Sequence, residues 1–181
     1  MEKISSEAFY NAWIKSVNNR KDHLLKIWRK PKEYTLHIKG DENCLIEEVS
    51  QNLNLLCYPR DYYSIDTVLY KQEDLVPNIK DGTYWFRDIR VAFEHENNFN
   101  GGLYQEVSHL LVVNADLKVL VAYPNRETES ELNYLRKIIK GNRQSKAISD
   151  EESFLIIFGY ENGFVWEGFV FKEDNWKSIR K

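Results

Sequence analysis

The chain has 181 residues, with 25 basic and 28 acidic side chains, a net charge of −3 and a pI of about 5.9. This length suits a single domain over residues 1–181, and a hydrophobic share of 43% excludes a wholly disordered chain. The acidic balance excludes a general basic field that attracts nucleic acid or acidic membranes, so such binding requires a local patch or a bound metal. The start of the chain has no apolar leader and no apolar run spans a bilayer, so we expect a cytoplasmic protein without membrane contact.

The N-terminal segment, residues 1–40, is predicted to form a helical cap. Apolar residues recur at helical spacing over residues 6–29, and Pro31 ends that pattern. A short extended segment is expected over residues 33–39. A second helix is expected to begin near Asp41, a residue type that often caps helix N-termini.

Strands dominate the middle of the chain. β-Branched and aromatic residues predict strands over residues 62–71 and 84–86. Residues 90–97 alternate in side-chain character, which predicts a strand with two different faces. An amphipathic helix over residues 103–114 and a mostly apolar strand over residues 117–123 follow.

The C-terminal part is expected to complete the sheet. It contains an amphipathic helix over residues 127–140 and two strands, residues 154–160 and 163–171, joined by a hairpin signal at Glu161 and Asn162. The order of helices and strands predicts an α/β protein with a central mixed sheet.

Acidic residues occupy unusual places in these elements. Asp66 lies inside a predicted strand that is otherwise apolar and aromatic, and Glu94 and Glu96 share one face of the next long strand. A strand-interior Asp is costly to bury alone, and two carboxylates on one strand face repel each other. The arrangement therefore favours a compensating cation, either a divalent metal or an arginine such as Arg87 or Arg90.

The order of these elements resembles the core of the PD-(D/E)XK nuclease superfamily, which has the restriction-endonuclease-like fold. The matching stretches are LIEEVSQNL, YYSIDTVLY, RVAFEHEN, LYQEVSHLL and LKVLVAYP. The resemblance implies a three-layer nuclease-like core over residues 41–124, with a central mixed sheet flanked by helices. Residues 125–181 would then complete the sheet.

The resemblance also implies a metal site. Asp66, Glu94 and the main-chain carbonyl of His95 would bind Mg²⁺ or Mn²⁺. Glu48 on the preceding helix would support the metal, with Glu47 as the alternative.

One position departs from the family pattern. Glu96 stands where the family usually has lysine, which makes the motif E-H-E, similar to the E-x-E of some type II restriction enzymes. Glu96 is then a candidate general base or second metal ligand. The missing positive charge would come from a second metal or from another lysine, such as Lys71 or Lys118. On the next helix, Gln105 and Glu106 match a polar motif of the family more weakly.

The histidines favour structural interpretations. His95 shares its strand face with Val91 and Phe93, which is typical of a core histidine. His109 and Glu106 are expected at solvated positions on the surface of their helix.

These features predict Mg²⁺-dependent hydrolysis of phosphodiester bonds in DNA by a site of Asp66, Glu94 and Glu96. The expected setting is restriction or defence, in a homodimer or a larger complex. Two alternatives stay open. One is an inactive protein of the same fold that binds or inhibits a partner, and the other is an unrelated α/β binding protein with Asp66 and Glu94 far apart.

Overall fold

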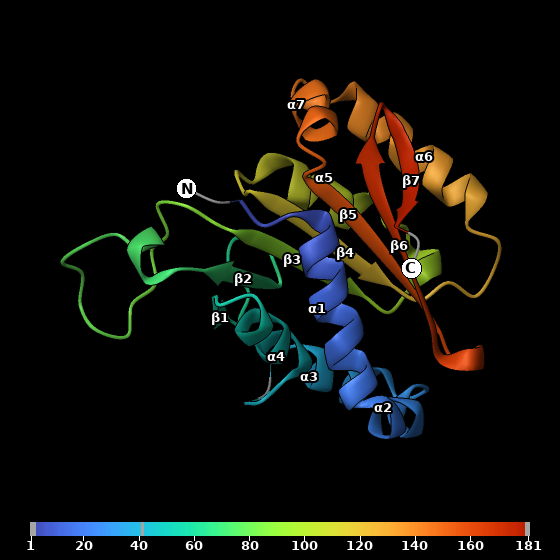
Figure 1. The fold of residues 1–181 in the computed structure, drawn as a ribbon, viewed down its shortest axis with the longest axis horizontal. Coiled ribbons are helices and arrows are strands. Elements are labelled where there is room, and N and C mark those ends of the chain that lie inside the picture. Colours follow the sequence, from blue (N-terminus) through green and yellow to red (C-terminus); the bar gives the residue numbers. More distant parts are fainter. Residues whose placement is uncertain (1–2, 41, 180–181) are drawn as a thin grey trace.

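The computed structural model describes residues 3–40 and 42–179, which form a seven-stranded mixed sheet with helices on both faces (Figure 1). The α-helices of this described part are α1 (Ser6–Asn19), α2 (Lys21–Ile27), α3 (Pro31–Ile38), α4 (Leu45–Asn52), α5 (Tyr104–Val112), α6 (Glu129–Gly141) and α7 (Ser145–Asp150). The strands are β1 (Leu56–Tyr58), β2 (Thr67–Tyr70), β3 (Val91–Glu96), β4 (Leu117–Ala122), β5 (Phe154–Tyr160), β6 (Val165–Lys172) and β7 (Asn175–Ile179). Short 3₁₀ turns occupy η1 (Gln72–Asp74), η2 (Phe99–Gly101) and η3 (Asn162–Phe164).

The strands lie in the sheet in the same order as in the chain. β1, β2 and β3 are antiparallel, β3, β4 and β5 are parallel, and β5, β6 and β7 are antiparallel. Helical crossovers connect the parallel strands, because a parallel pair cannot be joined by a tight turn. Helix α5 links β3 to β4, and α6 and α7 link β4 to β5.

The hydrophobic core has one cluster on each face of the sheet. Helices α1 to α4 contribute to the first cluster together with Val91 and Phe93 of β3. Helices α5 to α7 contribute to the second together with Ala92. This alternation along β3 follows the period of two in a strand. The prediction of an α/β protein with a central mixed sheet is confirmed.

Two predictions about the N-terminal segment are wrong. The helix predicted over residues 6–29 divides at Arg20 into α1 and α2, and residues 33–39 are helical in α3 instead of extended. Pro31 begins α3 rather than only ending the preceding helix, because proline lacks an N–H and its fixed φ suits a first helical turn. Tyr34 and Ile38, one helical turn apart, are both buried and hold α3 against the sheet.

The start of the next helix also differs from the prediction. Helix α4 begins at Leu45, with Cys44 as its N-cap residue. Asp41, the predicted N-cap, lies outside the described residues.

The predicted strand over residues 62–71 shortens to β2. Tyr63 and Ser64 adopt φ values of 51° and 67°, which an extended strand does not allow. Residues 84–86 make only an isolated bridge, between Leu75 and Phe86. The sequence patterns also missed β1, α7 and β7. Among the described residues, no helix combines the length and the apolar character needed to cross a bilayer.

Candidate functional site

Asp66 and Glu94 meet where β2 lies beside β3. Thr67 pairs with Phe93, so Asp66, one residue before β2, faces Glu94. The Asp66 amide donates to Glu94 Oε2 at 3.4 Å, and the His95 amide donates to Asp66 Oδ2 at 2.9 Å. Asp66 therefore precedes the strand instead of lying inside it. Its carboxylate accepts the hydrogen bond from the His95 amide that a backbone carbonyl would accept if the strand pairing continued. The structure brings together the two acids that were predicted to share a metal.

The backbone and the ring of His95 face different surroundings. In an antiparallel pair a residue presents its N–H and C=O to the same neighbour, so the His95 carbonyl lies on the strand edge that faces Asp66. The ring is buried, with Nε2 2.9 Å from the Tyr123 hydroxyl and the ring plane stacked on Tyr34. Burial, with a smaller effect of the Lys39 charge, lowers the pKa of His95 to about 3. The prediction of a core histidine is confirmed.

A lysine pairs with the first of these acids. Lys39 follows the last residue of α3, and its Nζ forms an ion pair with Asp66 Oδ1. Both side chains are 21% exposed. The lysines considered from the sequence lie elsewhere, because Lys71 follows the far end of β2 and Lys118 Nζ donates to the Ala115 carbonyl at 3.3 Å. The sequence pattern gave no sign of Lys39, because the residues that form α3 were expected to be an extended segment.

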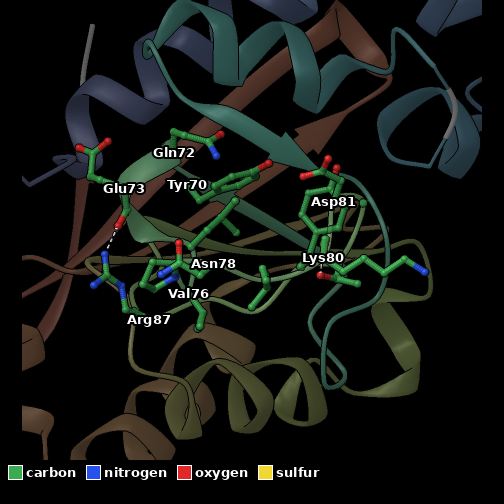
Figure 2. A pocket seen from close by; sticks show the side chains of 14 residues that line it. Tyr70, Gln72, Glu73, Val76, Asn78, Lys80, Asp81 and Arg87 are labelled. Atoms are coloured by element: carbon green, nitrogen blue, oxygen red, sulfur yellow. Dashed lines mark hydrogen bonds between the residues drawn. The ribbon is translucent and has the colours of Figure 1, made fainter.

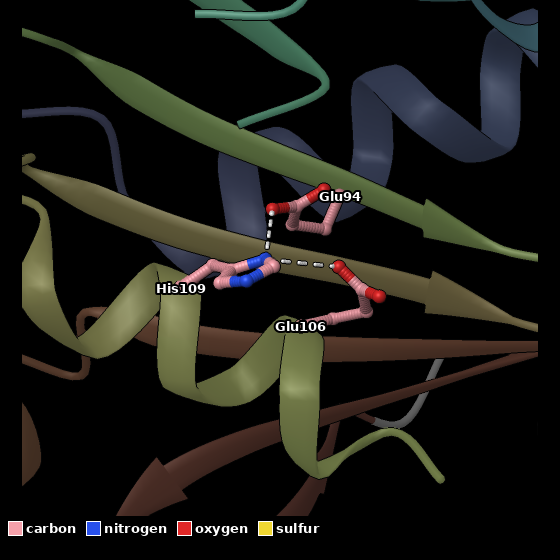
Figure 3. Close-up of side chains that lie close together, drawn as sticks. All are labelled: Glu94, Glu106 and His109. Carbon is pink, nitrogen blue, oxygen red and sulfur yellow. Dashed lines mark ion pairs between the residues drawn. The ribbon is translucent and has the colours of Figure 1, made fainter. Parts of the chain in front are cut away.

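Helix α5 places two further side chains against Glu94. Figure 3 shows Glu106 and His109 pointing from α5 toward Glu94 on β3. His109 Nδ1 lies 3.7 Å from Glu94 Oε1 and 3.4 Å from Glu106 Oε2. The potential ligand atoms of these three residues all lie within 4.8 Å of one another, the one such group found among the described residues. The spacing of three residues, which puts both side chains on one helix face, was the available sequence signal.

Negative charge accumulates at this point of the sheet. Glu94 is 1% exposed, and its Oε1 has no hydrogen-bond partner among the residues described. Burial raises the pKa of Glu94, and the charges of Asp66 and Glu106 raise it further. Burial also raises the pKa of Glu106, an effect that His109 opposes and that Glu96 and Asp66 increase. A bound cation would remove this mutual repulsion.

Glu96 and Gln105 lie at the rim of the group. Glu96 ends β3 on the same strand face as Glu94, and its Oε1 accepts a hydrogen bond from the Asn98 amide. Gln105 is exposed on α5. Glu96 is partly exposed to solvent, whereas Glu94 is buried.

Glu48 is placed on the other side of the sheet. Its carboxylate accepts hydrogen bonds from Asn19 Nδ2 and Arg20 Nε, each at 2.7 Å. Helix α4 packs on the sheet face that carries Phe93, opposite to the face of Glu94. The residue predicted to support the metal therefore holds α4 against α1, and Glu47 lies on the same helix.

The arginines considered as neutralising partners also have other contacts. Arg87 donates to the Glu73 carbonyl at 2.5 Å, and Arg90 forms ion pairs with Asp74 and Asp116. In the structure Lys39, rather than either arginine, is the cation paired with Asp66.

An open pocket of about 390 Å³ lies on the connection between β2 and β3 (Figure 2). Its lining includes Tyr70, Lys80, Asp81 and Arg87, so its charged side chains carry both signs. The acidic group comprises Asp66, Glu94 and Glu106. Tyr70 ends β2 whereas Asp66 precedes it, so roughly 13 Å of strand separates the pocket from this group. The pocket is therefore a separate feature from the acidic group.

No protein-family model matches the chain, and no curated protein matches it.

Proposed function

We propose that the chain is a metal-dependent nuclease of the restriction-endonuclease-like fold that hydrolyses phosphodiester bonds in DNA. The observation that carries this proposal is the convergence of Asp66 and Glu94, 28 residues apart in the chain, beside Lys39. The order α4, β2, β3, α5, β4 also agrees with the core order of the PD-(D/E)XK superfamily. The topology and the acidic group thus support the same class of protein.

The donor set fits a divalent cation. Carboxylate and carbonyl oxygens are the ligands that Mg²⁺ and Mn²⁺ prefer, and the buried Oε1 of Glu94 has no hydrogen-bond partner among the described residues. Asp66, Glu94 and the His95 carbonyl would hold the ion. When bound, such an ion polarises a phosphate oxygen and lowers the pKa of a coordinated water.

The protein's own side chains would perform the remaining steps. The Lys39 ammonium places a positive charge beside Asp66, where it stabilises negative charge that develops on a phosphate. Glu96, at the rim of the group, would take a proton from the attacking water. Hydrolysis forms a bond between the water oxygen and phosphorus and breaks the bond to the leaving oxygen, which takes a proton from solvent.

A DNA cleavage assay tests the proposal. We expect the wild-type chain to cut plasmid DNA with Mg²⁺ or Mn²⁺ and not with EDTA. Asp66→Asn and Glu94→Gln should each reduce the rate at least about a hundredfold, because loss of even an outer-shell partner reduces activity by about 10–100-fold. Glu129→Gln, an exposed first-turn glutamate of α6, is the matched control and should keep full activity.

Thermal unfolding separates chemistry from folding in these variants. Glu94→Gln replaces a carboxyl group whose ionised form is disfavoured by burial and by its acidic neighbours, so its melting temperature should equal or exceed that of the wild type. Equal residual cleavage in all variants would reveal a contaminating nuclease and reject the proposal. A wild-type chain that cuts no DNA would leave the inactive interaction protein as the better interpretation.

A further inference from the structure

We propose that α5 supplies two ligands of the metal site, Glu106 and His109, which join Glu94, so that a first-row transition ion binds in preference to Mg²⁺. The inference deepens the proposed function and rests on it for its biological meaning. Metal binding can nevertheless be measured without DNA cleavage, so the two proposals fail separately.

The spacing of the three side chains suits a shared ion. Nδ1 of His109 lies 3.7 Å from Glu94 Oε1 and 3.4 Å from Glu106 Oε2 (Figure 3). Two ligands that are each about 2.1 Å from one ion lie roughly 3.0–4.2 Å apart, depending on the angle between them. Both observed separations fall in this range, whereas 3.7 Å is too long for a hydrogen bond.

The atoms that face the centre of this group lack hydrogen-bond partners. Within the described part of the chain, Glu94 Oε1 and His109 Nδ1 are both buried and make no hydrogen bond. The two atoms are within ion-pair distance of each other, yet neither makes the hydrogen bond that buried polar atoms in folded proteins normally have. One cation between them would satisfy both atoms and the carboxylate of Glu106.

The imidazole determines which ion is preferred. Mg²⁺ is a hard ion that keeps oxygen ligands and waters, whereas an imidazole nitrogen adds affinity for first-row transition ions. Helix α5 fixes the geometry, because Glu106 and His109 project from successive turns of one rigid element. The His109 side chain is 43% exposed although its Nδ1 is buried, so the group lies just beneath the protein surface.

Mn²⁺ titration of the full chain, followed by electron paramagnetic resonance, tests the inference. We expect wild-type protein to bind Mn²⁺ more tightly than Mg²⁺ in competition, and to show a coupling between Mn²⁺ and a nitrogen nucleus. His109→Ala should abolish that coupling and weaken Mn²⁺ binding at least about tenfold. It should weaken Mg²⁺ binding less, so the selectivity for Mn²⁺ should fall.

Two further variants complete the design. Glu106→Gln should weaken Mn²⁺ binding about as much as His109→Ala while it keeps the nitrogen coupling. Ser108 lies between the two ligands on α5 and is exposed. Ser108→Ala is therefore the control and should change neither the Mn²⁺ affinity nor the nitrogen coupling. Melting temperatures of all variants verify that α5 remains folded.

Several outcomes would overturn the inference. A wild-type chain without nitrogen coupling, or unchanged Mn²⁺ affinity in His109→Ala, would show that the imidazole only neutralises its acidic neighbours. If Mn²⁺ binding is lost in Asp66→Asn and Glu94→Gln alone, the α5 ligands are rejected while the proposed nuclease site stands. Nitrogen-coupled Mn²⁺ without DNA cleavage would instead support the α5 ligands and reject the proposed function.

Discussion

At the scale of single residues, the buried carboxyl groups of the acidic group are electrostatically unfavourable for the folded chain. Asp66 and Glu106 disfavour the ionised form of Glu94, Asp66 also disfavours that of Glu106, and the ammonium of Lys39 forms its ion pair with Asp66. Proteins tolerate such local conflicts mainly where binding or catalysis needs them. The position of Lys39 gives this residue a role that can be separated from metal binding.

Replacing Lys39 tests that role. Lys39→Met keeps the aliphatic stem and removes the charge, so DNA cleavage should fall about a hundredfold, as it does when one stabilising donor is removed. Mn²⁺ binding should be unchanged or tighter, because Asp66 loses a competing cation. Lys26→Met, on the exposed side of α2, is the matched control. A parallel loss of Mn²⁺ binding in Lys39→Met would instead indicate a structural role.

At the scale of elements, a buried ion pair anchors the long connection between β2 and β3. Arg90 donates from Nε to Asp74 Oδ2 at 2.8 Å and from a terminal nitrogen to Oδ1 at 2.5 Å, and Asp74 is 1% exposed. Burial on its own would raise the pKa of Asp74, but hydrogen bonds from Arg90 and from the Lys71 amide lower this pKa overall. The pair therefore holds the connection against the start of β3.

The depressed pKa of Asp74 predicts a pH dependence of stability. Because the folded pKa lies below the unfolded value, the contribution of Asp74 is complete above about pH 4 and is lost as the pH falls further. Asp74→Asn should lower the free energy of unfolding by about 3–5 kcal/mol at pH 7, because it removes the carboxylate that two nitrogens of the buried Arg90 guanidinium contact.

Urea unfolding at pH 7 and at pH 3 measures this effect. The difference between the wild type and Asp74→Asn should shrink at the lower pH. Asp88→Asn, exposed in the same connection, should change stability little at either pH. An equal difference at both pH values would contradict the assigned role of the carboxylate.

At the scale of the whole molecule, α1 joins strands from both halves of the sheet. The Trp13 ring packs 5.8 Å from Phe93 of β3 and 5.4 Å from Trp166 of β6, measured between centroids. The Tyr10 hydroxyl donates to the Trp166 carbonyl at 2.8 Å. The N-terminal helix therefore connects the strand that carries Glu94 with the C-terminal hairpin (Figure 1).

This packing predicts one cooperative unit. Trp13→Ala should lower the free energy of unfolding by about 3–5 kcal/mol, because the fully buried ring leaves a cavity. Circular dichroism and fluorescence should report the same single urea transition in the wild type and in the variant. Trp85→Ala removes a ring that is 52% exposed and should cost far less. Two separate transitions would contradict the prediction of a single domain.

Hydrophobic periodicity determined much of the fold in advance. β3, β4 and β5 were predicted within a residue or two, because central strands carry dense apolar or alternating patterns. The edge strands β1 and β7 were missed, because short half-exposed strands carry a weak pattern. Helix α3 was missed because its start at Pro31 reads equally well as the end of a helix.

The sequence by itself singled out Asp66 and Glu94, because they stand out as acids among apolar neighbours. Only the tertiary structure decided what surrounds them. Lys39, at the end of α3, pairs with Asp66, and Glu106 and His109 of α5 lie beside Glu94. Glu48 instead contacts Arg20 at the end of α1. The physical reason is that local periodicity encodes which face of an element is buried. Which charges then meet depends on how separate layers dock on the sheet, and no local pattern records that.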